Sequence, residues 1–140
     1  MRVIAIMSAD HDAPALAELE AHAEVTRVAP SAERSSAGRH MLEPLRSGPL
    51  ARRIERMAWR SALGRNLLRI TPLDRSRRLW RVARRDGGLR DLMRSADVVV
   101  ALDRDAILTV WKLSRTAELG ESWDAVYGGT AALFALKNRR

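Results

Sequence analysis

The sequence contains no cysteine, so it can form neither disulfides nor zinc or iron–sulfur sites with cysteine ligands. It also lacks any apolar run close to the roughly 20 residues that a membrane-spanning helix requires. The apolar start of the chain is too short for a signal peptide, because Asp10, His11 and Asp12 interrupt it at once. These absences predict a cytoplasmic protein.

Two phosphate-binding motifs are absent as well. Neither the dinucleotide motif GxGxxG nor the P-loop motif GxxxxGKS or GxxxxGKT occurs, which removes the main support for both of those functions. The only histidines are His11, His22 and His40, and they support no Ser–His–Asp arrangement. The sequence therefore does not indicate any of these three kinds of site.

Positive charge is abundant but unevenly spread. The net charge is +8, and residues 27–94 alone hold 18 arginines against 6 acidic residues, or +12. The rest of the chain holds 7 basic and 11 acidic residues, or −4. Such a localised field attracts nucleic acid, anionic lipid or phosphorylated small molecules. The alternative is that the arginines only solvate helix faces, since 23 of the 25 basic residues are arginine, as a GC-rich genome would produce.

Alternating strand and helix patterns indicate an α/β fold. Arg2–Ser8 and Ala96–Leu102 are continuous apolar runs, which suit strands buried on both faces. The first run is followed by helix Ala13–His22 and strand Glu24–Ala29, and this strand–helix–strand unit implies parallel pairing with a right-handed crossover. The second run is followed by helix Ala106–Ala117, strand Trp123–Tyr127 and helix Thr130–Asn138. We therefore expect one domain over residues 1–140, a three-layer Rossmann-like fold with about four parallel strands.

Residues 31–95 are expected to form a basic loop and helical insert after the second strand. Ser31–Pro49 is loop-like, and Leu50–Ile70 has apolar residues at helical spacing. Further helices are expected over Asp74–Arg85 and Leu89–Ser95. If the first helix lies on an anionic membrane surface, its apolar stripe should be exposed and flanked by basic residues; these are Leu50, Ile54, Met57 and Leu67, flanked by Arg52, Arg53, Arg56 and Arg60.

Two alternatives to membrane binding stay open for this insert. Its arginines could contact the phosphates of nucleic acid, although no helix-turn-helix spacing or RNA-binding signature supports that. Trp59 and Trp80 could instead be core residues that dock the insert on the sheet, which is the more common fate of a single tryptophan.

Polar residues follow three of the expected strands, at the edge where open parallel sheets bind ligands. The candidate ligand-binding residues are Ser8, Asp10 and Asp12, then Asp105, then Tyr127, Gly128, Gly129 and Thr130. Asp103 and His11 are the candidate catalytic residues. The glycine pair opens a helix, where an anion is favoured.

The four aspartates at this edge have two interpretations. Asp10, Asp12, Asp103 and Asp105 could together hold Mg²⁺. In the interpretation that we favour, Asp12 and Asp105 are helix caps and the other two are ordinary loop acids. We therefore expect no metal and no cofactor.

Residues 97–103, Asp-Val-Val-Val-Ala-Leu-Asp, followed by an apolar helix, resemble the DVVHAHD strand of GT-B glycosyltransferases of the family 4 type. The opening strand is similar too, and residues 24–28 stand where the family has HEVTVV. Basic helices occupy the same place in membrane-associated members. The resemblance implies the N-terminal, acceptor-binding domain of such an enzyme, working with a partner that carries the nucleotide-sugar domain.

The chain departs from the family in ways that bear on activity. Residues 8–12 replace the family's Gly-rich turn, and Val100 and Leu102 stand where the family often has histidines. The 140 residues do not contain the family's nucleotide-sugar domain, so the chain alone is expected not to transfer sugar. The alternative function is a non-enzymatic module that binds a polyanion, with attachment to the inner face of the membrane ahead of nucleic acid.

Overall fold

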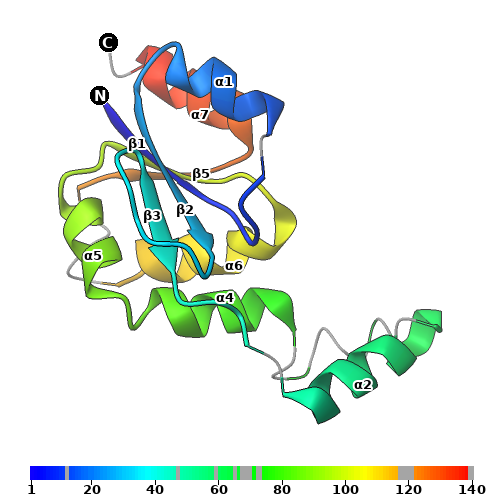
Figure 1. The fold of residues 1–140 in the computed structure, drawn as a ribbon. Coiled ribbons are helices and arrows are strands. Elements are labelled where there is room, and N and C mark those ends of the chain that lie inside the picture. Colours follow the sequence, from blue (N-terminus) through cyan, green and yellow to red (C-terminus); the bar gives the residue numbers. More distant parts are fainter. Residues whose placement is uncertain are drawn as a thin grey trace.

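The centre of the computed structural model is a parallel sheet of five strands in the order β3-β2-β1-β4-β5 (Figure 1). The structure describes residues 1–11, 13–46, 48–58, 60–64, 66, 71, 74–116 and 122–138. The strands are β1 (Arg2–Ile6), β2 (Glu24–Pro30), β3 (Arg39–Leu42), β4 (Val98–Ala101) and β5 (Asp124–Tyr127). The predicted three-layer α/β class is confirmed, with five strands where the sequence indicated about four.

The two longest apolar runs of the chain form the centre of the sheet. Residues 3–6 of β1 and all four residues of β4 are buried. β1 pairs in parallel with β2 on one side and with β4 on the other, so that Ile4 lies between Thr26 and Val99. A strand enclosed in this way has no solvated face, which explains why its sequence is continuously apolar instead of alternating.

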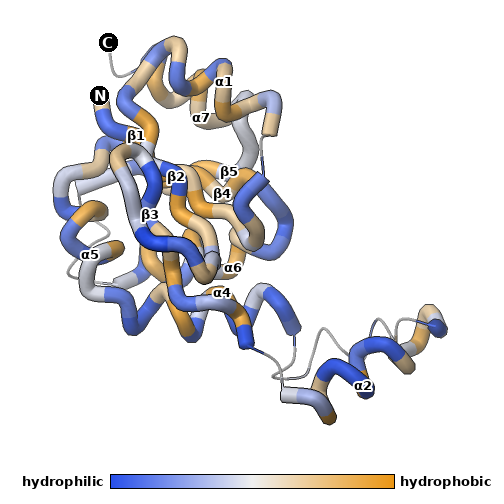
Figure 2. The backbone as a smooth tube through the Cα atoms, viewed as in Figure 1, coloured by the Kyte–Doolittle hydropathy of each residue, from blue (hydrophilic) through white to orange (hydrophobic). Residues whose placement is uncertain are grey.

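Helices cover both faces of the sheet (Figure 1). α1 (Pro14–Glu20) and α7 (Gly129–Asn138) lie on one face, and α4 (Arg75–Ala83), α5 (Gly87–Arg94) and α6 (Arg104–Ser114) lie on the other. The tube in Figure 2 is most hydrophobic in the strands between these two layers.

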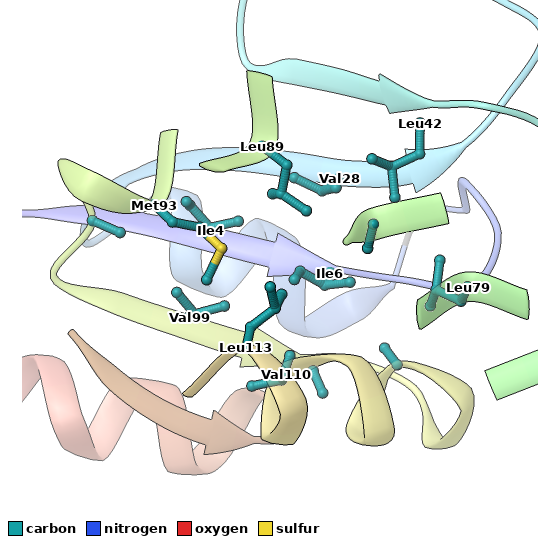
Figure 3. Packing of buried hydrophobic residues seen from close by; sticks show 14 of the residues in the cluster. Ile4, Ile6, Val28, Leu42, Leu79, Leu89, Met93, Val99, Val110 and Leu113 are labelled. Atoms are coloured by element: carbon teal, nitrogen blue, oxygen red, sulfur yellow. The ribbon is translucent and has the colours of Figure 1, made fainter. Parts of the chain in front are cut away.

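Successive residues of β1 face different helix layers, as the pleat of a strand requires. Val3 and Ala5 belong to the core cluster under α1 and α7, whereas Ile4 and Ile6 belong to the cluster under the other layer. Figure 3 shows Ile4 and Ile6 among side chains from three helices: Leu79 of α4, Leu89 and Met93 of α5, and Val110 and Leu113 of α6.

The edge strand β3 was not predicted, and the loop expected over Ser31–Pro49 is wrong where this strand lies. β3 pairs in parallel with β2, and residues 31–38 return the chain without a helix. Ser36 and Arg39 exchange backbone hydrogen bonds across a turn in which Gly38 has φ +73°. A type II turn requires such a φ at this position, which favours glycine. β3 has only two apolar residues, Met41 and Leu42, too few to form an apolar run.

The expected basic insert is present, and it also supplies part of the three-layer core. α4 and α5 bury Leu79, Ala83, Leu89 and Met93. The helix predicted over Leu50–Ile70 is shorter than expected: α2 spans Pro49–Ala58, and a turn follows at residues 60 and 61. The Ser61 hydroxyl accepts a hydrogen bond from the Gly64 N–H at 2.9 Å, which favours a new helical start. Leu67 and Trp59 lie outside the described residues.

The packing of α1 on α7 gives a stability prediction. A Cβ atom on Gly129 would lie 2.4 Å from the Cβ of Ala15 on α1, so Gly129→Ala should force the two helices apart. Overpacking of this kind costs about 1–3 kcal/mol, and we expect that loss in urea unfolding followed by tryptophan fluorescence.

The matched control is Gly87→Ala at the start of α5, where a Cβ atom would meet nothing within 4 Å. This variant should unfold within about 0.5 kcal/mol of the wild type, as surface substitutions usually do. Equal stability of the two variants would contradict the close contact between α1 and α7.

Candidate functional site

The sheet order brings the predicted site groups to one edge. β1, β4 and β5 are neighbours, so the segments that follow them leave from the same carboxyl edge of the sheet. The chain runs from β1 toward β2 and from β4 toward β5, in opposite directions. The gap between β1 and β4 is therefore the switch point, where ligands bind in open α/β sheets.

Asp103 lies at the switch point, and both of its carboxylate oxygens are already engaged. Oδ2 accepts a hydrogen bond from the backbone N–H of Ser8 at 2.6 Å, and Oδ1 accepts one from the N–H of Ala106 at 2.9 Å. The second bond makes Asp103 the N-cap of α6, so the prediction that Asp105 caps this helix and that Asp103 is an ordinary loop acid is wrong. One carboxylate thus joins the loop after β1 to the start of α6, which is a structural role.

The other two described carboxylates of this edge make separate contacts. Asp105 accepts a hydrogen bond from the Ser76 hydroxyl of α4 at 3.2 Å, so it links α4 to α6. Asp10 is exposed and lies 3.6 Å from a guanidinium nitrogen of Arg39. Among the described residues no group of three His, Asp or Glu side chains could hold a metal ion, and Asp12 lies outside them.

The candidate base His11 is exposed, and its Nδ1 atom lies 2.9 Å from the carbonyl oxygen of Ala9. This contact is local to the loop after β1. Within the described residues the ring makes no hydrogen bond with Asp103. The two predicted catalytic residues therefore do not form a hydrogen-bonded pair.

Backbone conformation and packing explain why both positions after β5 are glycine. Gly128 has φ +85°, a conformation that favours glycine, and its N–H donates to the carbonyl oxygen of Ala101 at 2.9 Å. Gly129 contacts Ala15, as described above. Tyr127 and Thr130 are exposed beside them. These contacts explain both glycines by backbone geometry and helix packing, and the predicted anion site there stays a prediction.

A cleft of about 420 Å³ opens at the carboxyl ends of β1, β2 and β3. The loop after β1 supplies Ser8, and α4 supplies the cations Arg75 and Arg78. The Arg75 guanidinium donates to the Ser8 carbonyl oxygen at 3.1 Å. The other described lining residues come from the segments after β1, β2 and β3 and from α2: Ala9, Pro30, Ser31, Ala32, Pro44, Leu45 and Glu55.

Sequence reasoning found Ser8 but missed Arg75, Arg78 and Ser31. The two arginines are not distinctive in a chain with 23 of them. Their position at the cleft follows from the course of the chain after β3, and β3 itself carried no clear signal.

α2 projects away from the sheet and its two helix layers (Figure 1). It has no buried residue, and its apolar side chains Leu50, Ile54 and Met57 are 71%, 45% and 64% exposed. Arg52, Arg53 and Arg56 of α2 are exposed as well, as is Arg60 in the following turn. The expected exposure of the stripe is therefore confirmed for its three described members. A side-chain contact with the layers is made by Glu55, whose Oε1 lies 2.6 Å from Nη2 of Arg78 on α4.

A second basic surface lies between α4 and α6. A groove of about 570 Å³ is lined by Trp80 and Trp111 together with Arg77, Arg81, Leu108 and Lys112. Trp111 is 41% exposed, and the charged ends of Lys112 and Arg115 lie 5.3 and 5.2 Å from the centre of its indole ring. Trp80 is half-buried and packs against the core cluster, so it both docks α4 and lines this groove.

Comparison of the chain with protein-family models, with curated proteins and with solved structures gave no significant match. Among the described residues, no helix has the length and apolar character needed to cross a membrane.

The contacts of Asp103 give a second stability prediction. Asp103→Ala should lower the free energy of unfolding by about 2–4 kcal/mol, from loss of a helix cap and of the partner of a part-buried N–H. The control is Asp105→Ala, which removes a single, longer hydrogen bond and should cost about 1 kcal/mol or less. Urea unfolding measures both, and equal losses in the two variants would refute the role assigned to Asp103.

Proposed function

We propose that this chain is the acceptor-binding half of a two-domain glycosyltransferase of the GT-B type, and that a separate domain supplies the nucleotide-sugar. The observation that carries the proposal is the cleft at the carboxyl ends of β1, β2 and β3, because open parallel sheets bind their ligands at this edge. The resemblance of residues 97–103 and 24–28 to this type of enzyme supports it, as does the three-layer parallel fold.

In this function the described residues bind and orient an acceptor. Ser8 and Ser31 offer hydroxyl groups, and Arg75 and Arg78 offer guanidinium groups to the polar part of the acceptor. Asp103 holds the loop that carries Ser8 and is a positioning residue. His11 of the same loop is the candidate base for the acceptor hydroxyl.

The proposal predicts that the chain of 140 residues alone gives no turnover. Transfer requires donor and acceptor to be held together, and proximity supplies about 7–11 kcal/mol of the barrier reduction in well-oriented reactions. We expect only background release of nucleoside diphosphate from UDP- and GDP-sugars with the purified chain, measured by a coupled assay or by mass spectrometry. Robust sugar transfer by this chain would refute the need for a second domain.

A second candidate function, binding to an anionic membrane surface, is favoured by the exposed stripe of α2. Leu50, Ile54 and Met57 have no protein partner that buries them, and arginines flank them. An interfacial helix inserts such a stripe below the headgroups while its cations contact anionic lipid. Nucleic acid would engage the arginines alone and would leave the stripe without a role. The cytoplasmic leaflet, which is rich in anionic lipid, is the surface that we propose.

The membrane function predicts that α2 carries the affinity for lipid. In Leu50→Ser combined with Ile54→Ser, binding to vesicles with anionic lipid should fall about ten-fold or more, because each apolar side chain contributes about 1.5–3 kcal/mol when fully buried. Sedimentation with vesicles measures the change. The control is Phe134→Ser on α7, an apolar position whose exposure of 66% is close to that of Leu50, and this variant should bind as the wild type does.

Charge provides the second arm of this experiment. Exposed cations contribute about 1 kcal/mol each near an anionic membrane and are screened by salt, so binding should weaken as salt rises and should be lost on neutral vesicles. Equal binding to neutral vesicles, or an unchanged double variant, would exclude α2 as the membrane-binding helix.

A further inference from the structure

The charged groups of the cleft are not balanced among themselves. Among the described residues that line the cleft, Arg75 and Arg78 carry two positive charges, and Glu55 of α2 carries one negative charge. The Arg78–Glu55 pair is close at 2.6 Å, and the two side chains are only 15% and 22% exposed. The described lining residues therefore leave one positive charge in excess, and the Glu55 carboxylate already occupies part of the space beside Arg78.

The guanidinium of Arg78 is also incompletely bonded. Its Nη2 atom donates to Glu55, whereas its Nε–H is buried and has no hydrogen-bond partner. A single carboxylate oxygen on one nitrogen leaves unused the paired N–H geometry with which arginine binds carboxylate or phosphate through two oxygens. A buried donor without a partner costs free energy, so an anion that contacts both nitrogens would be favoured over Glu55.

Hydroxyl groups complete the surroundings of this anion position. Ser8 is 8% exposed, and among the described residues its hydroxyl makes no hydrogen bond. The Ser31 hydroxyl oxygen accepts a hydrogen bond from the N–H of Glu33 at 3.1 Å, and its own proton remains to donate. Two cations and two hydroxyl groups around one cleft match the several oxygens and the charge of a phosphate monoester, near −2 at neutral pH.

We propose that the cleft binds a phosphate monoester, which displaces the Glu55 carboxylate from Arg78. The phosphate takes two N–H donors of Arg78, and Arg75 neutralises its second charge. The acceptor of the proposed glycosyltransferase would then be a phosphate-bearing molecule, so the acceptor assignment rests on the proposed function. Phosphate binding itself does not: it stands even where no sugar is transferred.

The experiment titrates the full chain with glycerol 3-phosphate at constant ionic strength, followed by NMR or calorimetry. The wild type should bind saturably in the millimolar range or tighter. Arg78→Gln should weaken binding at least ten-fold. Arg77→Gln on the same helix makes the same change of charge but lines the groove with Trp80 instead, and it should bind like the wild type.

Glu55→Gln tests whether the phosphate displaces the Glu55 carboxylate, and this variant leaves Arg78 unchanged. Removing the competing carboxylate should tighten phosphate binding several-fold, whereas a Glu55 that merely supports the cleft would make the same variant bind more weakly. Thermal unfolding verifies that each variant is folded. Weaker binding by Glu55→Gln, or no saturable binding by either the wild type or this variant at tens of millimolar phosphate, would overturn the proposal.

Binding to vesicles distinguishes a lipid phosphate from a soluble phosphate ester as the ligand of the cleft. Phosphatidic acid presents a phosphate monoester, whereas phosphatidylglycerol presents a diester with a single negative charge, so the share of phosphatidylglycerol is raised until the two kinds of vesicle have the same surface charge. If the monoester of a lipid headgroup occupies the cleft, Arg78→Gln should reduce binding to phosphatidic acid vesicles more than binding to phosphatidylglycerol vesicles. If the ligand is soluble, glycerol 3-phosphate binds, and Arg78→Gln changes binding to the two kinds of vesicle by the same factor.

Discussion

The carboxylate of Asp103 fixes the geometry on which the candidate site depends. It joins the N–H of Ser8, after β1, to the N–H of Ala106, in the first turn of α6. These two segments leave the sheet at its switch point and run toward opposite faces. Ser8 in turn accepts a hydrogen bond from Arg75 through its carbonyl oxygen, so the same brace positions the start of α4. Asp103 is not among the described residues that line the cleft, and it sets the position of the cleft residue Ser8 through this contact.

The long apolar runs predicted the central strands of the sheet, whereas the short and partly polar sequence of the edge strand β3 did not predict a strand. The apolar runs at β1 and β4 specify buried parallel strands because no other position in a small domain removes both faces from water. β3 has a charged first residue and a histidine whose ring contacts Asp86 at 2.9 Å, so half of its sequence reads as polar. Its existence depends on pairing with β2, and pairing of distant segments cannot be inferred from a short polar stretch.

The sequence predicted which edge of the sheet carries the candidate site, but not which contacts its residues make. Asp103 was located correctly at the carboxyl edge, yet the sequence could not show that backbone donors engage both of its oxygens. Arg75 and Arg78 were missed because only the path from β3 through α2 to α4 brings them to the cleft. The helix expected over Leu50–Ile70 is too long. Its apolar spacing continues past residue 58 and suggested one helix, whereas the turn at residues 60 and 61 interrupts the backbone after α2.

The Arg78–Glu55 pair links the cleft to α2. The Arg78 side chain is only 15% exposed, so its guanidinium needs a counter-ion, because removing one partner of a buried pair costs about 3–5 kcal/mol when burial is complete. That requirement fixes the presence of an anion beside Arg78 but not its identity. Glu55 meets it from a helix that has no buried residue of its own, so little else opposes its replacement. An anion that binds Arg78 in the cleft would therefore compete with the Glu55 contact between α2 and α4. Anion binding and the position of α2 are coupled through this contact.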